Sequence, residues 1–206
     1  MTIVIWDGKT LVADRRRTNS RCKNPEYQYS ASTKIQIFSG LDWEPGEPIL
    51  AGGFSGSVKQ IDDFLNFLKG ISPESSASEL VSDHFKSQYV QPHFHGILVT
   101  SKRSLRFPDL TRGVVSHSHG DECLLAIGMH TSAVIKLSDL LNGATAFELV
   151  FLSMGLSTSV GDGINYWSLK NPVIRKKQFF SLTEKIRLTK KFQTAIQKLT
   201  LENIRS

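Results

Sequence analysis

Residues 2–14 read Thr-Ile-Val-Ile-Trp-Asp-Gly-Lys-Thr-Leu-Val-Ala-Asp and directly follow the initiator methionine. The Asp7-Gly8 pair between two apolar runs predicts a β-hairpin, because such a pair suits the tight turn that joins antiparallel strands. Removal of Met1 would expose the α-amino group of Thr2, a base with a pKa of about 7.7–8.0. A hydroxyl beside such an amine is an activated nucleophile. The alternative is an ordinary first strand, in which Thr2 is only a good strand former.

The composition predicts one domain, with or without an appendage. A chain of 206 residues with 40% hydrophobic residues is long and apolar enough to bury a core. No apolar run approaches the roughly 20 residues of a membrane-spanning helix, and the first residues lack the pattern of a signal peptide. Cys22 and Cys123 form neither a disulfide framework nor a metal pair. We therefore expect a reduced, cytoplasmic protein that does not enter a membrane.

The net charge of +6 is concentrated at one end of the chain. Residues 171–206 contain nine Lys or Arg and two Glu, whereas residues 1–170 are close to neutral. We predict a globular domain over residues 1–170 and a basic amphipathic helical tail over residues 171–206. The tail could dock on its own body or on a neighbouring subunit, or it could bind an acidic partner or nucleic acid. Its apolar content favours docking, because it is high enough to form an apolar helix face.

Hydrophobic periodicity separates strands from helices along the chain. After the hairpin and a loop over residues 15–29, strands are expected over residues 32–38, 49–54, 95–100, 122–128 and 163–169, with short ones at 105–107 and 114–115. A turn-rich connection is expected over residues 40–48, and helices over residues 57–69, 76–87, 131–141 and 144–154. Helices that come in pairs between groups of strands favour two packed antiparallel sheets, with a helix pair on each outer face.

Five segments in this order resemble the proteasome β-subunit family of N-terminal-nucleophile (Ntn) hydrolases, which includes the ring protease HslV and short bacterial and phage relatives. They extend over about residues 2–169, so the tail lies outside the resemblance. The segments are Thr2-Ile-Val with Asp7-Gly8 and Ala13-Asp-Arg15, Ser32-Thr-Lys-Ile-Gln-Ile37, Ala51-Gly-Gly-Phe-Ser-Gly-Ser57, Leu125-Ala-Ile-Gly128, and Ala146-Phe-Glu-Leu149 leading to Val160-Gly-Asp-Gly-Ile-Asn165.

The resemblance implies an α+β fold, a four-layer αββα sandwich with the basic helical tail added at its C-terminus. It implies a threonine peptidase or amidase that acts on peptides or proteins. It also implies a homo-oligomer built as a ring or stacked rings, and an ATP-dependent unfoldase as a candidate partner. We expect no cofactor and no metal, and nucleic acid is a less favoured partner.

Four residues of this chain match the catalytic positions of the family. Thr2 would be the nucleophile, with its own amine as the base. Lys34 would lie beside the Thr2 hydroxyl and lower its pKa, and Asp14 would orient Lys34 and keep it charged. The N–H of Gly52 would face the developing oxyanion. The alternatives are a solvated lysine, a turn aspartate and a simple glycine bend.

The chain also departs from the family pattern. Met129 stands where active members carry a serine, and Ser157 and Val160 stand where they carry an aspartate and a serine. The first hairpin is short, and a short hairpin could fail to bring Asp14 to Lys34. These departures favour a rival function, a catalytically inactive relative that serves as a structural or assembly module. We also hypothesise that His130 replaces one of the missing polar groups.

Four further histidines occur in two pairs at the period of a strand. His93 with His95, and His117 with His119, could in principle bind Zn²⁺ or Ni²⁺. Nothing in the sequence directs one pair toward the other, so solvated histidines at strand ends and in loops are the favoured interpretation. A nucleic-acid accessory protein with a basic tail is the third and least favoured function.

Overall fold

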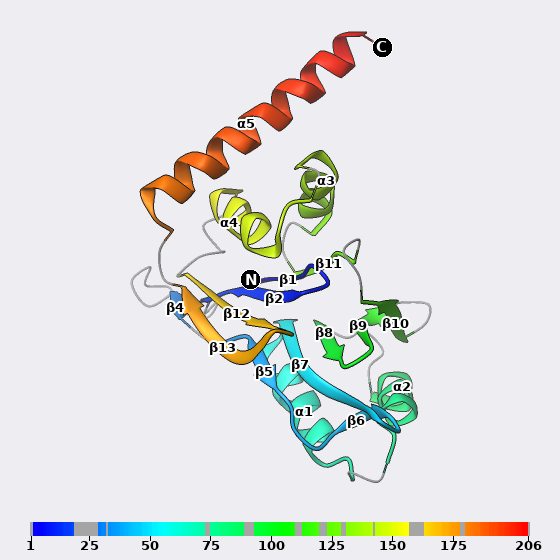
Figure 1. The fold of residues 1–206 in the computed structure, drawn as a ribbon. Coiled ribbons are helices and arrows are strands. Elements are labelled where there is room, and N and C mark those ends of the chain that lie inside the picture. Colours follow the sequence, from blue (N-terminus) through cyan, green and yellow to red (C-terminus); the bar gives the residue numbers. More distant parts are fainter. Residues whose placement is uncertain are drawn as a thin grey trace.

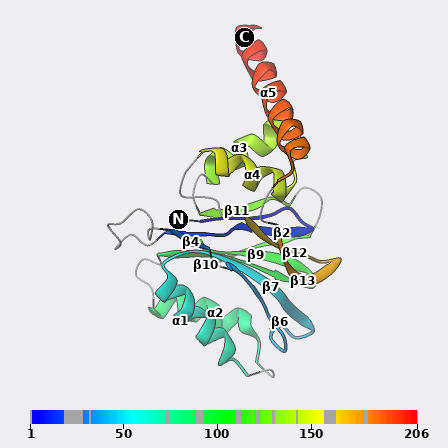
Figure 2. The ribbon, with the colours of Figure 1, turned by 90° about the vertical axis from the view of Figure 1, so that its left-hand side faces the viewer.

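The computed structural model describes residues 2–18, 29–31, 33–72, 75–88, 93–109, 113–119, 123–128, 131–141, 143–156, 163–177 and 180–205. Two antiparallel sheets pack face to face, and a pair of helices covers the outer face of each sheet (Figure 1, Figure 2). The predicted αββα sandwich is therefore confirmed.

The first sheet contains the N-terminal hairpin at its centre. Its strands in spatial order are β11 (Leu125–Gly128), β1 (Ile3–Trp6), β2 (Thr10–Asp14), β12 (Ile164–Ser168) and β13 (Asn171–Lys177). The hairpin pairs Trp6 with Leu11, and Gly8 in its turn has a φ of 83°. The Asp7 carboxylate accepts the N–H groups of Thr10 at 2.7 Å and of Ala146 at 2.9 Å. Asp7 thus closes the turn and also caps the first residue of a helix.

The second sheet contains the long strand that packs against the N-terminal hairpin. Its strands in spatial order are β10 (Gly113–Ser118), β9 (Arg103–Asp109), β8 (Phe94–Thr100), β7 (Glu47–Gly56) and β5 (Ile35–Ile37), with β6 (Asp42–Glu44) paired to β7. The turn-rich connection predicted over residues 40–48 therefore includes a short strand. The loop predicted over residues 15–29 includes β3 (Arg16–Thr18), which pairs with β4 (Tyr29–Ala31) in a separate ribbon.

Four helices form the two outer layers. They are α1 (Val58–Lys69) and α2 (Ala77–Gln88) on the second sheet, and α3 (Thr131–Leu141) and α4 (Ala146–Leu156) on the first (Figure 2). Ser57 caps α1, since its side chain accepts the N–H of Gln60. A cluster of phenylalanines lies between the second sheet and α1 and α2 and includes Phe54, Phe64, Phe85, Phe94 and Phe107. The predicted helix pairs are confirmed.

The C-terminal tail begins differently from the prediction. A helix from residue 171 onward is wrong for the first seven residues, because Asn171–Lys177 forms β13. Pro172 cannot donate a helix hydrogen bond, and the β-branched Val173 and Ile174 favour a strand. The free edge of β12 provides the partner, with Tyr166 opposite Arg175. The division of the chain at residue 170 stays a prediction.

The tail helix α5 (Leu182–Arg205) packs on the body through its first half. Leu188 is buried, and Lys191 donates to the Glu148 carboxylate of α4 at 2.9 Å. Burial would raise the pKa of Glu148, but the hydrogen bond from Lys191 and the neighbouring positive charges lower it. Towards the C-terminus α5 extends away from both sheets (Figure 1). These contacts favour the docking interpretation of the tail.

Close contact between the two sheets depends on a glycine in β7. A Cβ at Gly53 would lie 2.5 Å from a Val4 methyl carbon, closer than real Cβ atoms approach. Val4 and its neighbours on both sheets form a buried core between the sheets. Glycine at this position therefore lets β7 lie against β1.

We expect Gly53→Ala to lower the free energy of unfolding by about 1–3 kcal/mol, since the added methyl group overpacks this core. Urea denaturation measures the change. Gly70→Ala is the matched control, because Gly70 has a φ of −83° and its Cβ would approach no described atom closer than 3.4 Å. Equal effects of the two substitutions would contradict the overpacking.

A buried carboxylate network closes the opposite end of β7. Glu47 is fully buried, and Arg103 binds it through Nε at 2.9 Å and through a terminal nitrogen at 2.6 Å. Thr100 also donates to Glu47. Burial alone would raise the pKa of Glu47, but these hydrogen bonds and the charge of Arg103 lower it.

We expect Arg103→Met to lower the free energy of unfolding by about 3 kcal/mol at neutral pH, because it leaves a buried carboxylate without its cation. In the wild type the stabilisation from Glu47 is present above the unfolded-state pKa and is lost as the pH falls through the lowered, folded-state pKa. In the variant, protonation of Glu47 relieves the penalty. The difference between the two proteins should shrink from pH 8 to pH 4.5, whereas Lys59→Met on the surface should change little at either pH.

Candidate functional site

The predicted site is organised by the carboxylate of Asp14, the last residue of β2. Asp14 is fully buried. Its Oδ1 accepts the N–H of Ile3 at 2.9 Å and the ammonium of Lys34 at 2.8 Å, and its Oδ2 accepts the N–H of Arg16 at 3.2 Å. One oxygen atom thus joins the start of β1 to the residue that precedes β5. The short hairpin does bring Asp14 to Lys34.

Lys34 places a nearly buried positive charge beside the N-terminal strand. Its side chain is 8% exposed, and its ammonium donates to the carbonyl of Arg16 as well as to Asp14. A buried ammonium is costly unless it is paired and hydrogen-bonded. The Asp14 carboxylate and the Arg16 carbonyl offset that cost and fix the position of the ammonium group.

Thr2 lies where β1, β7 and β11 meet. It is 8% exposed, and its carbonyl oxygen accepts the Ser55 hydroxyl at 3.3 Å. Gly128, the last residue of β11, pairs with Ile3 and has a φ of 97°. A Cβ at Gly128 would lie 1.9 Å from the Thr2 carbonyl oxygen, so only glycine leaves room for Thr2 here.

The fourth predicted residue, Gly52, belongs to the second sheet. Gly52 lies inside β7, between Gln36 and Leu98 in the ladder, and its Cβ would point to the phenylalanine cluster. The β7 residue that contacts Thr2 is Ser55. Three residues of a strand span about 10 Å. The role of the Gly52 amide as oxyanion donor stays a prediction.

Gly56 is the last residue of β7 and directly follows Ser55. The N–H of Phe54 donates to the carbonyl of Lys34 at 3.2 Å, and that of Ser57 donates away from it, to His93, at 2.8 Å. Because alternate N–H groups of a strand point to opposite sides, the amides of Gly52 and Gly56 are both expected on the side of Phe54. Gly56 has a φ of 124°, and a Cβ there would lie 2.3 Å from the His93 carbonyl oxygen.

The contact of Ser55 with Thr2 and the steric role of Gly128 were not predicted from the sequence. Met129, His130, Ser157 and Val160, on which the predictions about missing polar groups depend, lie outside the described residues.

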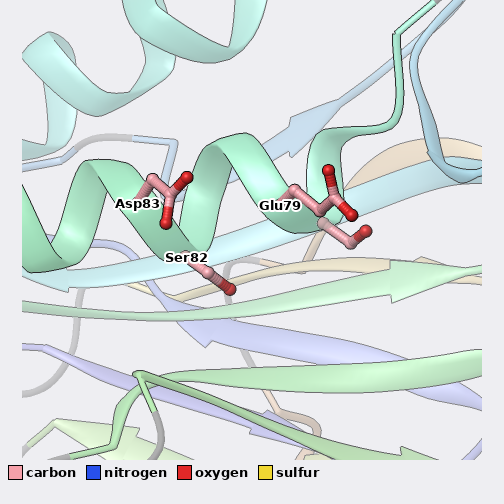
Figure 3. A pocket seen from close by; sticks show the side chains of 4 residues that line it. Glu79, Ser82 and Asp83 are labelled. Atoms are coloured by element: carbon pink, nitrogen blue, oxygen red, sulfur yellow. The ribbon is translucent and has the colours of Figure 1, made fainter.

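A surface hollow of about 410 Å³ lies on α2, away from these residues. It is lined by Ser78, Glu79, Ser82 and Asp83 (Figure 3). The helix belongs to the layer outside the second sheet (Figure 2), whereas Thr2 directly precedes β1 and Asp14 ends β2, two strands of the first sheet. The hollow therefore has no part in the predicted site.

The histidine pairs do not converge on one site. His119 places Nε2 2.9 Å from the carbonyl oxygen of Thr100 and packs edge-on against Trp6. Burial and the charge of Arg106 lower the pKa of both His95 and His117. Within the described ranges, no three His, Cys, Asp or Glu side chains gather closely enough to hold a metal ion.

In the part of the chain that the structure describes, no helix is both long enough and apolar enough to span a bilayer.

Comparison of the sequence with protein-family models and with curated proteins finds no match. Among solved structures, the chain is similar to an Anbu (Gly-1) mutant from Hyphomicrobium sp. strain MC1, with a TM-score of 0.62 and 14% identity over 97% of this chain and 96% of that one. It is also similar to the eukaryotic HslV from Trypanosoma brucei, with a TM-score of 0.49 and 16% identity over 80% of this chain and 96% of that one. The Anbu match spans nearly all of both chains. The chain therefore has the fold of the proteasome-like Ntn hydrolases.

Proposed function

We propose that this protein is a threonine-type peptidase or amidase in which Thr2 becomes the N-terminal nucleophile once Met1 is removed. The observation that carries the proposal is the buried Asp14 carboxylate, which binds the amide of Ile3 and the ammonium of Lys34 through one oxygen atom. This contact places a fixed positive charge next to the first strand. The proteasome-like fold supports the same chemistry.

The reaction uses the α-amine and the hydroxyl of Thr2 after Met1 has been removed. Its α-amine, acting through a water molecule, takes the hydroxyl proton while the hydroxyl oxygen attacks the carbonyl carbon of a substrate amide. The tetrahedral intermediate collapses, the proton passes to the leaving amine, and the acyl group remains on Thr2 as an ester. A water molecule then attacks this ester, which releases the acid and restores the hydroxyl.

Lys34 and Asp14 act on this reaction electrostatically. The Lys34 ammonium favours the deprotonated form of a nearby Thr2 hydroxyl and so lowers its pKa. Asp14 orients Lys34 and keeps it charged. Both side chains are shielded from water, with exposures of 8% and 0%, so the interaction is weakly screened.

We propose the Gly52 amide as the oxyanion donor, with the Gly56 amide, which follows the residue that contacts Thr2, as the second candidate. In a regular strand both amides lie on the side of β7 from which Phe54 donates to Lys34. One donor of this kind contributes about 10²–10³-fold to the rate.

We further propose that the enzyme works as a homo-oligomer in the cytoplasm, as a ring or stacked rings, with an ATP-dependent unfoldase as a candidate partner and peptides or proteins as substrates. The family resemblance supports this assembly. The rival is an inactive structural or assembly module. Met129 and Val160, which replace polar groups of active relatives, favour that rival.

The test of function is the intact mass of the purified protein before and after a peptide epoxyketone, which reacts with N-terminal threonines. We expect loss of one methionine and then one adduct, and no adduct with Thr2→Ala. Retained Met1, or a trimmed protein that never forms the adduct, would overturn the proposal and favour the inactive module.

A second prediction separates catalysis from folding. Lys34→Met should slow adduct formation by about 10²–10³-fold, because it removes the fixed charge beside the nucleophile. It should also destabilise the fold, because Asp14 is left buried without a cation.

The double variant Asp14→Asn with Lys34→Met is the matched control, since it removes both charges. It should regain part of the free energy of unfolding without regaining the rate of adduct formation. If the double variant forms the adduct as fast as the wild type, neither Asp14 nor Lys34 takes part in the mechanism.

A further inference from the structure

An N-terminal nucleophile is attached to the rest of the chain by a single peptide bond, through its carbonyl group. Terminal residues fray unless other parts of the fold tie them down. After removal of Met1, Thr2 would be such a residue, and a displacement of 1 Å at a reacting group can cost about 10²-fold in rate. The site therefore needs a contact that fixes Thr2 itself.

Ser55 supplies that contact from the opposite sheet. Its hydroxyl donates to the Thr2 carbonyl oxygen at 3.3 Å, and its residue is 5% exposed. A buried hydroxyl is costly without a hydrogen bond, so the carbonyl of Thr2 also satisfies Ser55.

Gly128 of β11 leaves the space for this hydrogen bond. A Cβ at Gly128 would lie 1.9 Å from the Thr2 carbonyl oxygen and 2.7 Å from the Ser55 hydroxyl oxygen. The hydrogen bond between Ser55 and Thr2 thus runs directly past the Cα of Gly128. Residues of β7 and β11 thus contact the carbonyl group of Thr2, which directly precedes β1.

We propose that Ser55 is a positioning residue that fixes Thr2 relative to Lys34 through β7. The neighbouring Phe54 donates its N–H to the carbonyl of Lys34 at 3.2 Å. The Ser55 hydroxyl and this ladder bond therefore attach the nucleophile and the cation to consecutive residues of one strand. The inference rests on the proposed function of Thr2.

The kinetic test uses Ser55→Ala. We expect the maximal rate of epoxyketone adduct formation to fall about 10- to 10²-fold, with the reagent concentration at half-maximal rate unchanged, because Ser55 contacts Thr2 and not the reagent.

The matched control is Ser153→Ala. Ser153 is fully buried and donates to the Leu149 carbonyl oxygen at 2.8 Å, within α4 itself. Ser153→Ala should lower the free energy of unfolding and leave the rate of adduct formation unchanged. Equal loss of rate in both variants, or no loss in Ser55→Ala, would overturn the proposal.

A second readout does not require activity. Thr2-Ile3 is the only Thr-Ile pair in the sequence, so protein labelled with ¹³C-carbonyl threonine and ¹⁵N-isoleucine gives one HNCO peak, which reports the Thr2 carbonyl. In Ser55→Ala this carbonyl should move to lower ¹³C shift, because it loses a hydrogen bond, whereas Ser153→Ala should leave it in place.

The two readouts distinguish failure of this inference from failure of the proposed function. If the wild type never forms the adduct, the proposed function fails, and the position of the HNCO peak alone decides whether Ser55 holds Thr2. An unmoved peak in Ser55→Ala overturns the inference in either case.

Discussion

The hydrogen bonds of the Asp14 carboxylate are the interaction on which the site depends. A fully buried carboxylate is unfavourable unless its oxygens are satisfied. In this chain Oδ1 and Oδ2 accept two backbone amides and one ammonium. These partners come from β1, from the segment after β2, and from the residue before β5. A single side chain therefore links the first strand to the second sheet, and it keeps the Lys34 ammonium close to the start of β1.

Glycine determines how closely the strands approach around that carboxylate. Gly53 allows β7 to lie against Val4, and Gly128 allows the carbonyl of Thr2 to lie against β11. A methyl group at either position would overlap with an atom of β1 or of the residue before it. The absence of side chains at Gly53 and Gly128 therefore shapes the site as much as its polar residues do. It also lets the Ser55 hydroxyl reach the Thr2 carbonyl oxygen.

The sequence was sufficient for the hairpin, the helix pairs and the two-sheet architecture, because each depends on local turn residues and on periodicity. It was not sufficient for the register of β7. Residues 51–57 contain three glycines, so the alternation of side chains that would show which residue faces Thr2 is missing, and the contact of Ser55 with Thr2 could not be predicted. The contact between Asp14 and Lys34 depends on the register between two sheets, and β13 depends on the free edge of β12. Both are tertiary effects that no local pattern contains.

The strand β13 has a consequence for how copies of this chain can associate. It is the last strand of the first sheet, and its Arg175 and Lys176 are exposed. An edge strand presents unpaired N–H and C=O groups on which another strand can add, and charged side chains, lysine above all, oppose such addition. Two copies meeting at this edge would bring these cations close together. The charges therefore oppose edge-to-edge pairing of two copies at β13, so a contact between copies is favoured at other surfaces.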